Sequence, residues 1–203
     1  MKIALTGVTG RVGSRLAAEL LRRGHAVTGI ARDVSKAQAK PGLRLEAADV
    51  NRGEALASIL SGHDAVISAS RFVSTDPAAV IAAVRKAGVP RLLVVGGAGS
   101  LEVASGAMLV DTPGFPEAYK PEALGGIEFL KALRSEKALD WAFLSPPAKF
   151  EPGERTGACR IGDDRLLVDG TGRSWISMED YAIALVDELE NPKHSRQRFT
   201  VGY

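Results

Sequence analysis

A glycine-rich stretch near the N-terminus constrains the fold of this chain more than any other feature. Residues 2–13 read KIALTGVTGRVG, in which a short apolar run precedes three glycines, Gly7, Gly10 and Gly13. The apolar residues that follow recur at helical spacing. The stretch therefore predicts a buried strand, a tight turn and a helix in direct succession.

Such a turn is suited to a pyrophosphate. The first N–H groups of a helix have no intrahelical partner and lie at the positive end of the helix dipole, so they attract anions. Glycine allows the backbone to approach the phosphate oxygens closely. The glycine spacing departs from G-x-G-x-x-G, and the alternative is an ordinary strand-to-helix turn. The position beside the first strand, with an α/β pattern behind it, favours dinucleotide binding.

Length and composition indicate one globular domain spanning residues 1–203. The chain has 45% apolar and 25% charged residues and a net charge of +2, which gives no argument for nucleic-acid binding. No apolar stretch has the length of a membrane span, and no signal-peptide pattern opens the sequence. The single cysteine, Cys159, cannot form an intramolecular disulfide, and we interpret it as a packing residue. We expect a cytoplasmic protein without a membrane partner.

Short apolar segments alternate with helical patterns along most of the chain. This alternation predicts an α/β fold, a Rossmann-like doubly wound parallel sheet with helices on both faces. The segments expected as strands are 3–5, 25–31, 43–47, 64–68, 91–95, 141–144 and 199–201, and the intervening helices begin near residues 12, 51, 77, 121 and 178.

Two segments interrupt this alternation. Residues 101–119 have little periodicity and are expected to form a loop across the mouth of the site. Residues 149–173 are expected to form a small insertion within the domain. There, 157–161 and 165–168 flank a Gly-Asp-Asp turn and predict a hairpin. This insertion is a candidate lid on the substrate side, and the alternative is an edge hairpin that serves only packing.

Charged residues follow the second predicted strand, about 20 residues past the last glycine, where this fold meets the adenosine ribose. An acidic residue there binds a free 2′-hydroxyl, whereas an arginine accommodates a 2′-phosphate. Arg32 comes first and Lys36 follows closely, so we favour NADP over NAD. In the alternative interpretation, Arg32 is a surface charge and Asp33 caps a helix.

The ends of the other predicted strands carry further candidates. Asp49 follows the third strand and could accept a hydrogen bond from adenine or cap the next helix. Ser70 would lie over the cofactor beyond the fourth strand, and Gly96 and Gly97 follow the fifth. Ligands bind beyond the carboxyl ends of parallel strands, which is where all these positions fall.

Four stretches give the sequence a family resemblance: KIALTGVTGRVG, ARD, VVGGAGSL and SWISMEDYAIAL. It resembles the atypical short-chain dehydrogenase/reductases, specifically the NAD(P)H-binding group with NmrA-like, biliverdin reductase B-like and putative NADH-flavin reductase proteins. The resemblance implies pyrophosphate at residues 9–12 and adenine at Asp49 and Val50. It also implies a ribose at Ala69 and Ser70 and nicotinamide at Pro146 and Pro147. The cofactor-binding residues expected in all are Gly7, Thr9, Gly10, Arg11, Val12, Gly13, Arg32, Asp49, Val50, Ala69, Ser70, Gly96, Gly97, Pro146 and Pro147.

The proton-transfer residues of the larger superfamily are not reproduced. That superfamily pairs a tyrosine with a lysine four residues later, but Tyr119 is followed at that distance by Ala123. The serine often found past the fifth strand falls near Ala98, which leaves Ser100 as a displaced substitute. Tyr119 and Ser100 are the candidate catalytic residues, and the alternative for Tyr119 is a loop residue packed on the lid.

We interpret the chain as an NADPH-dependent oxidoreductase that transfers hydride to a small conjugated acceptor such as a flavin or a quinone. Such an acceptor can be protonated by water, so the missing tyrosine–lysine pair is tolerable. The alternatives are a non-catalytic NADP(H)-binding redox sensor of the NmrA-like type and a nucleotide-sugar epimerase or dehydratase. We expect no metal site, no nucleic-acid partner, and a monomer or homodimer.

Overall fold

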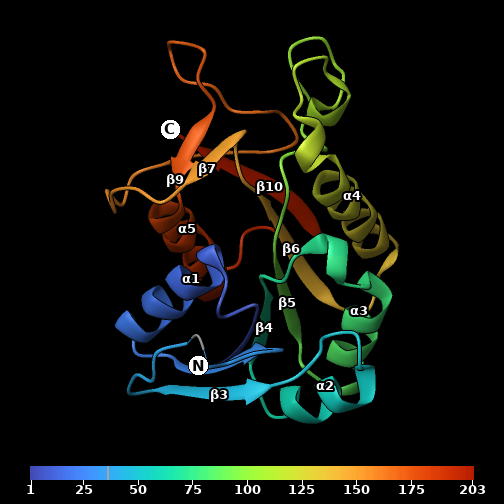
Figure 1. The fold of residues 1–203 in the computed structure, drawn as a ribbon, viewed down its shortest axis with the longest axis vertical. Helices are drawn as coiled ribbons and strands as arrows, with labels where there is room; N and C mark the ends of the chain where they lie inside the picture. The colour runs from blue at the N-terminus through green and yellow to red at the C-terminus, as the bar shows by residue number, and fades with distance from the viewer. Residues whose placement is uncertain (36) are drawn as a thin grey trace.

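The computed structural model describes residues 1–35 and 37–203, and these residues build a mostly parallel central sheet (Figure 1). The strand order is β3-β2-β1-β4-β5-β6-β10-β8, and every neighbouring pair is parallel except β10 with β8. This arrangement confirms the predicted Rossmann-like α/β fold. The strands are β1 (Lys2–Thr6), β2 (Ala26–Ala31), β3 (Leu43–Ala47), β4 (Ala65–Ser68), β5 (Arg91–Val95), β6 (Asp140–Ser145), β8 (Arg160–Gly162) and β10 (Gln197–Gly202).

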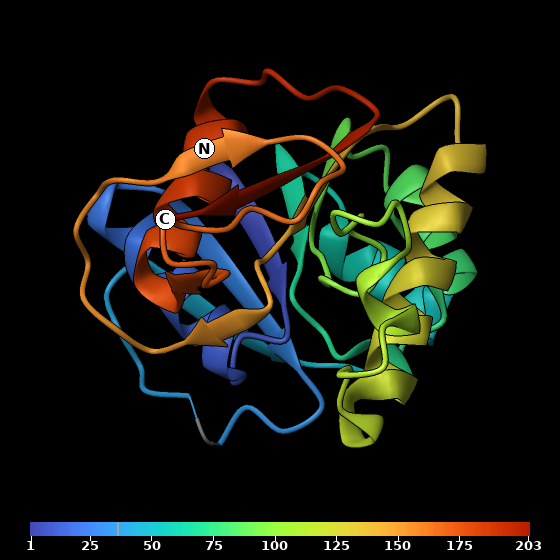
Figure 2. The same cartoon turned by 90° about the horizontal axis from the view of Figure 1, so that it is seen from above.

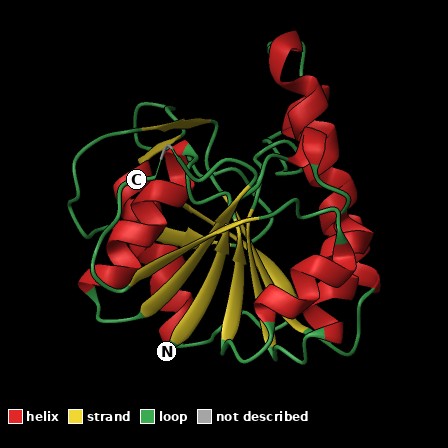
Figure 3. Cartoon of the chain, turned by 60° about the horizontal axis from the view of Figure 1, so that its bottom comes forward, coloured by secondary structure: helices red, strands yellow, loops and turns green. Residues whose placement is uncertain are grey.

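Helices cover both faces of the sheet, as Figures 2 and 3 show. On one face α1 (Arg11–Arg22) packs beside α5 (Met178–Glu190), and their apolar residues form one buried cluster with the sheet. On the other face lie α2 (Gly53–Leu60), α3 (Pro77–Lys86) and α4 (Lys120–Ser135), which bury a second cluster. Among the described residues, none of the helices is long and apolar enough to cross a membrane.

The predicted hairpin within residues 149–173 is wrong. Strand β8 pairs antiparallel with β10, while residues 165 and 166 contact Glu102 in the preceding loop. A further strand, β7 (Lys149–Glu151), pairs in parallel with β9 (Trp175–Ser177). Strand β8 pairs with the open edge of β10, which is distant in the sequence, and not with the residues just beyond the Gly-Asp-Asp turn. The composition of the turn does not indicate this long-range pairing.

The segment that follows β7 is fastened to the helices of the first face. The backbone N–H of Gly153 donates to Glu179 at 2.8 Å, and that of Gly157 donates to Asp180 at 2.9 Å. Arg155 donates to Glu19 of α1 through two bonds of 3.2 Å. This part of the insertion therefore runs along α1 and α5.

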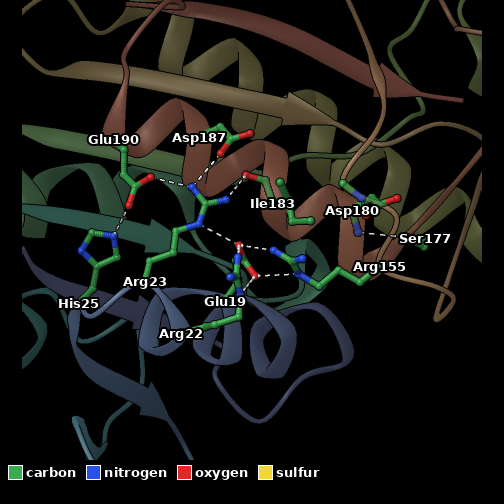
Figure 4. Close-up of polar contacts among 11 residues, drawn as sticks. Glu19, Arg22, Arg23, His25, Arg155, Ser177, Asp180, Ile183, Asp187 and Glu190 are labelled. Carbon is green, nitrogen blue, oxygen red and sulfur yellow. Dashed lines mark hydrogen bonds and ion pairs between the residues drawn. The ribbon is translucent and has the colours of Figure 1, made fainter.

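An ionic cluster joins α1 to α5 (Figure 4). Its centre is Glu19, whose side chain is only 5% exposed and which accepts a hydrogen bond from Arg23 at 2.8 Å. Arg23 also donates to Asp187 at 2.7 Å and to Glu190 at 2.6 Å, both on α5. His25 contacts the second oxygen of Glu190 at 2.9 Å. Helix α1, which follows the glycine turn, is thus fixed by ion pairs to α5 near the C-terminus.

Candidate functional site

The glycine turn is packed so tightly that Gly7 and Gly13 have no room for a Cβ. Gly7 has a φ of +70°, and a Cβ there would lie 2.4 Å from the carbonyl oxygen of Ala69. A Cβ on Gly13 would lie 2.1 Å from the carbonyl oxygen of Gly7. The N–H of Gly7 donates to Ile30 in β2 at 2.8 Å. These contacts bring the ends of β1, β2 and β4 and the start of α1 to one point.

The start of α1 is available to an anion. Its N-cap is Gly10, which has no side chain to accept from the first N–H groups of the helix. Gly10, Arg11 and Val12 all line the larger of two cavities at this end of the sheet. A cradle that admits no Cβ, beside an uncapped helix start, fits a diphosphate. Gly13 is not among the residues that line the cavities, so its role is the close packing of helix against turn.

The first cavity, of about 350 Å³, lies beyond the carboxyl ends of β2 and β3. Arg32 is exposed at its edge, and Asp33 uses one carboxylate oxygen to accept from the N–H and hydroxyl of Ser35 at 2.9 and 2.6 Å. Asp49 accepts from the N–H of Asn51 at 3.0 Å. Lys36 lies outside the described residues. The predicted residues at this cavity are Gly7, Thr9, Gly10, Arg32, Asp49, Val50, Ala69 and Ser70.

The second cavity, of about 700 Å³, is lined mainly by apolar side chains. The structure brings the predicted Gly96, Gly97, Pro146 and Pro147 together here. A Cβ on Gly96 would lie 2.5 Å from the ring of Phe143, so this strand end also requires glycine. The sequence prediction missed most of the walls, which come from Phe72, Leu109, Phe115, Phe150 and Met178.

The two cavities meet at the glycine turn, where they share Gly10, Ala69, Ser70 and Arg71. The hydroxyl of Ser70 donates to that of Thr6 at 3.0 Å, which fixes this side chain over the end of β1. Arg71 was missed by the sequence prediction, although it directly follows the predicted Ala69 and Ser70. It is the one charged residue, among those that the structure describes, that lines both cavities.

The segment that begins with Arg71 is anchored to α4. The Nε of Arg71 lies 3.6 Å from Oε2 of Glu122, and the same carboxylate accepts from the N–H groups of Phe72 and Val73 at 2.8 and 3.2 Å. The ring of Phe72 stacks on that of Phe143 at a centroid distance of 6.2 Å. One carboxylate of α4 therefore positions the segment between the two cavities.

The two cavities, joined at the glycine turn, fit a dinucleotide, and comparison with known proteins identifies the family of the chain. A family model described as "NAD(P)H-binding" matches residues 7–192. The chain belongs to this NAD(P)H-binding family. The match confirms the resemblance seen in the sequence.

Solved structures similar to this member of the NAD(P)H-binding family span its whole length. A "putative exported protein" from Burkholderia pseudomallei is 47% identical, with all of both chains covered and a TM-score of 0.89. A "putative epimerase" from Bacteroides thetaiotaomicron is 45% identical, covering 100% of this chain and 96% of that chain, with a TM-score of 0.94. A "putative NADH-flavin reductase" from Streptococcus pneumoniae is 36% identical, covering 100% and 99%, with a TM-score of 0.85.

The two candidate catalytic residues of this NAD(P)H-binding protein lie in different surroundings. Tyr119 lines the second cavity and its side chain is 66% exposed at the rim. Ser100 is not among the lining residues; its hydroxyl accepts from Arg198 at 3.3 Å. Tyr181 is fully buried, its hydroxyl donates to the carbonyl of Leu144 at 2.6 Å, and burial raises its pKa far above the ordinary value. The structure thus brings Tyr119, but not Ser100, to the cavity.

Proposed function

We propose that this protein is an NADPH-dependent reductase of a small, flat, conjugated acceptor such as a flavin or a quinone. The observation that carries the proposal is the pair of cavities meeting at the glycine turn, one with Arg32 at its edge and the other walled by aromatic and apolar side chains. The similar protein from Streptococcus pneumoniae, described as a putative NADH-flavin reductase, supports the same reaction class.

Each cavity has a distinct part in this proposal. The first would hold the adenosine half, with Arg32 facing the 2′-phosphate, and the uncapped start of α1 would bind the diphosphate. Gly96, Gly97, Pro146 and Pro147 would bound the nicotinamide ring at the second cavity. When bound, NADPH supplies the hydride. The apolar walls would hold the acceptor ring flat and position it for hydride transfer.

No described side chain is arranged as a strong proton donor in the second cavity. The carboxylate of Glu122 accepts hydrogen bonds from two backbone N–H groups, and Tyr119 has Ala123 where a lysine would assist it. A reduced flavin or quinone can take its proton from water. We therefore expect Tyr119→Phe and Ser100→Ala to change kcat by less than about twofold, measured as NADPH oxidation. A loss of about a hundredfold in either variant would instead identify a proton donor.

The cofactor preference depends on Arg32. We expect Arg32→Ala to raise the Kd of NADPH by about 10- to 100-fold, because one or two charge-assisted hydrogen bonds to the 2′-phosphate are lost. The Kd of NADH should stay nearly constant, since NADH lacks that phosphate. Tryptophan fluorescence titration measures both constants. Arg44→Ala, an exposed arginine on β3, is the matched control and should leave both unchanged.

Steady-state oxidation of NADPH with FMN, riboflavin and quinones tests the function itself. Turnover with at least one acceptor is the expected result. Tight NADPH binding with no turnover would favour a redox sensor. The similar Bacteroides protein is described as a putative epimerase, and an epimerase returns its hydride to the substrate. Net NADPH consumption therefore separates the reductase from that alternative.

A further inference from the structure

The second cavity has an excess of positive charge at its rim. Among its described lining residues, Arg11, Arg71 and Lys149 are cationic and Glu122 alone is anionic. Glu122 is already engaged, because it accepts two backbone N–H groups and lies 3.6 Å from Arg71. Arg71 also lines the first cavity beside the glycine turn, so it lies at the proposed cofactor, and Arg11 and Lys149 remain to be assigned.

These two cations come from different elements of the fold. Arg11 is the first residue of α1, beside the glycine turn, so it belongs with the diphosphate of the cofactor. Lys149 instead is the first residue of β7 and comes two residues after Pro147, which bounds the proposed nicotinamide position. Lys149 is thus the cation left for the acceptor.

The backbone of Lys149 is fixed, whereas its side chain is accessible. Its N–H donates to the carbonyl of Ser174 at 2.9 Å, and the ring of the next residue, Phe150, packs against Tyr181 at a centroid distance of 4.6 Å. The side chain of Lys149 is 66% exposed, and its Nζ lies 3.4 Å from the carboxylate of Glu151, which is 59% exposed. Exposed ion pairs of this kind contribute little, so the ammonium group can exchange Glu151 for an anion on a ligand at small cost.

We propose that Lys149 recognises a phosphate or carboxylate group on the acceptor, and that the physiological acceptor is therefore a flat conjugated anion. This inference rests on the proposed function for the place of the acceptor in the second cavity. The apolar walls would take the conjugated rings, and the ammonium group would take the charged substituent at the solvent edge.

Matched pairs of acceptors test the role of the charge. FMN and riboflavin share one ring system and differ in a phosphate; 1,4-naphthoquinone and its 2-carboxylate differ in a carboxylate. We expect the wild-type protein to favour the charged member of at least one pair in kcat/KM. Lys149→Gln should lower that preference by about tenfold, the equivalent of one charge-assisted contact, and Lys149→Arg should restore most of it. Lys131→Gln, an exposed lysine on α4, should leave the preference unchanged.

A binding measurement separates anion recognition by Lys149 from the proposed reductase function. Flavin fluorescence gives the Kd of FMN and of riboflavin for the NADP⁺-loaded protein without any turnover. If FMN binding weakens in Lys149→Gln while no acceptor is reduced, anion recognition stands and the reductase function fails. The proposed role of Lys149 is wrong if the wild-type protein does not prefer the charged member of either pair. It is also wrong if Lys149→Gln keeps the wild-type preference. The relative effects on the phosphate and carboxylate pairs identify which anion it prefers.

Discussion

Gly13→Ala is expected to weaken NADPH binding by a factor on the order of 100 and to lower the free energy of unfolding by about 2–3 kcal/mol. The added Cβ would lie 2.1 Å from the carbonyl oxygen of Gly7 and 2.8 Å from its carbonyl carbon. Both atoms are backbone, so the clash cannot be relieved by a rotamer change. Helix α1 would have to move away from the turn, and the proposed diphosphate cradle would open.

The matched control is Gly53→Ala in α2. Gly53 is also a helical glycine, but its nearest neighbour to an added Cβ is 3.9 Å away. Alanine there should stabilise the helix by up to about 1 kcal/mol and leave NADPH binding unchanged. Urea unfolding and fluorescence titration measure the two effects for both variants. NADPH affinity at the wild-type level in a folded Gly13→Ala protein would place the cofactor away from this turn and remove the basis of the proposed function.

The parts of the fold that the sequence predicted correctly are those with local signals. The apolar run in β1, the glycines after it and the helical spacing of α1 are adjacent in the chain, so their pattern is readable without tertiary contacts. The start of α5, predicted near residue 178, also has a local cause: the hydroxyl of Ser177 accepts from the N–H of Asp180 at 3.0 Å and caps the helix.

The acceptor side of the site could not be predicted in this way because distant segments assemble it. Phe72 contacts Phe143 of β6 and Phe129 of α4, and no periodicity links these three rings. Ser100 follows a strand end as a catalytic serine would, yet its hydroxyl accepts from Arg198 in β10. Arg71 could have been proposed as a cation next to predicted ribose contacts, but the carboxylate of α4 that anchors the next two residues is distant in the sequence.

Glu19→Gln is expected to lower the free energy of unfolding by about 3 kcal/mol at pH 7. Glutamine preserves the shape of the side chain but removes the negative charge that faces Arg22, Arg23 and Arg155. Since Glu19 is buried, water cannot readily take its place as the partner of these arginines. Glu128→Gln on the surface of α4, whose partner Lys131 lies 3.8 Å away, is the control and should change stability by less than about 0.5 kcal/mol.

The pH dependence of the stability difference between wild type and Glu19→Gln shows whether the charge of Glu19 causes it. Burial raises the pKa of Glu19, but hydrogen bonds from Arg22, Arg155 and Arg23 outweigh it and lower the pKa to about 2. In the unfolded chain the Glu19 carboxyl should titrate at about pH 4.3. The charge therefore stabilises the wild-type protein fully above that pH and progressively less as the pH falls toward 2. Urea unfolding should therefore show the gap between wild type and Glu19→Gln narrowing below about pH 4.3. A gap of equal size at pH 7 and pH 3 would mean that the cluster stabilises the α1–α5 contact through packing and not through charge.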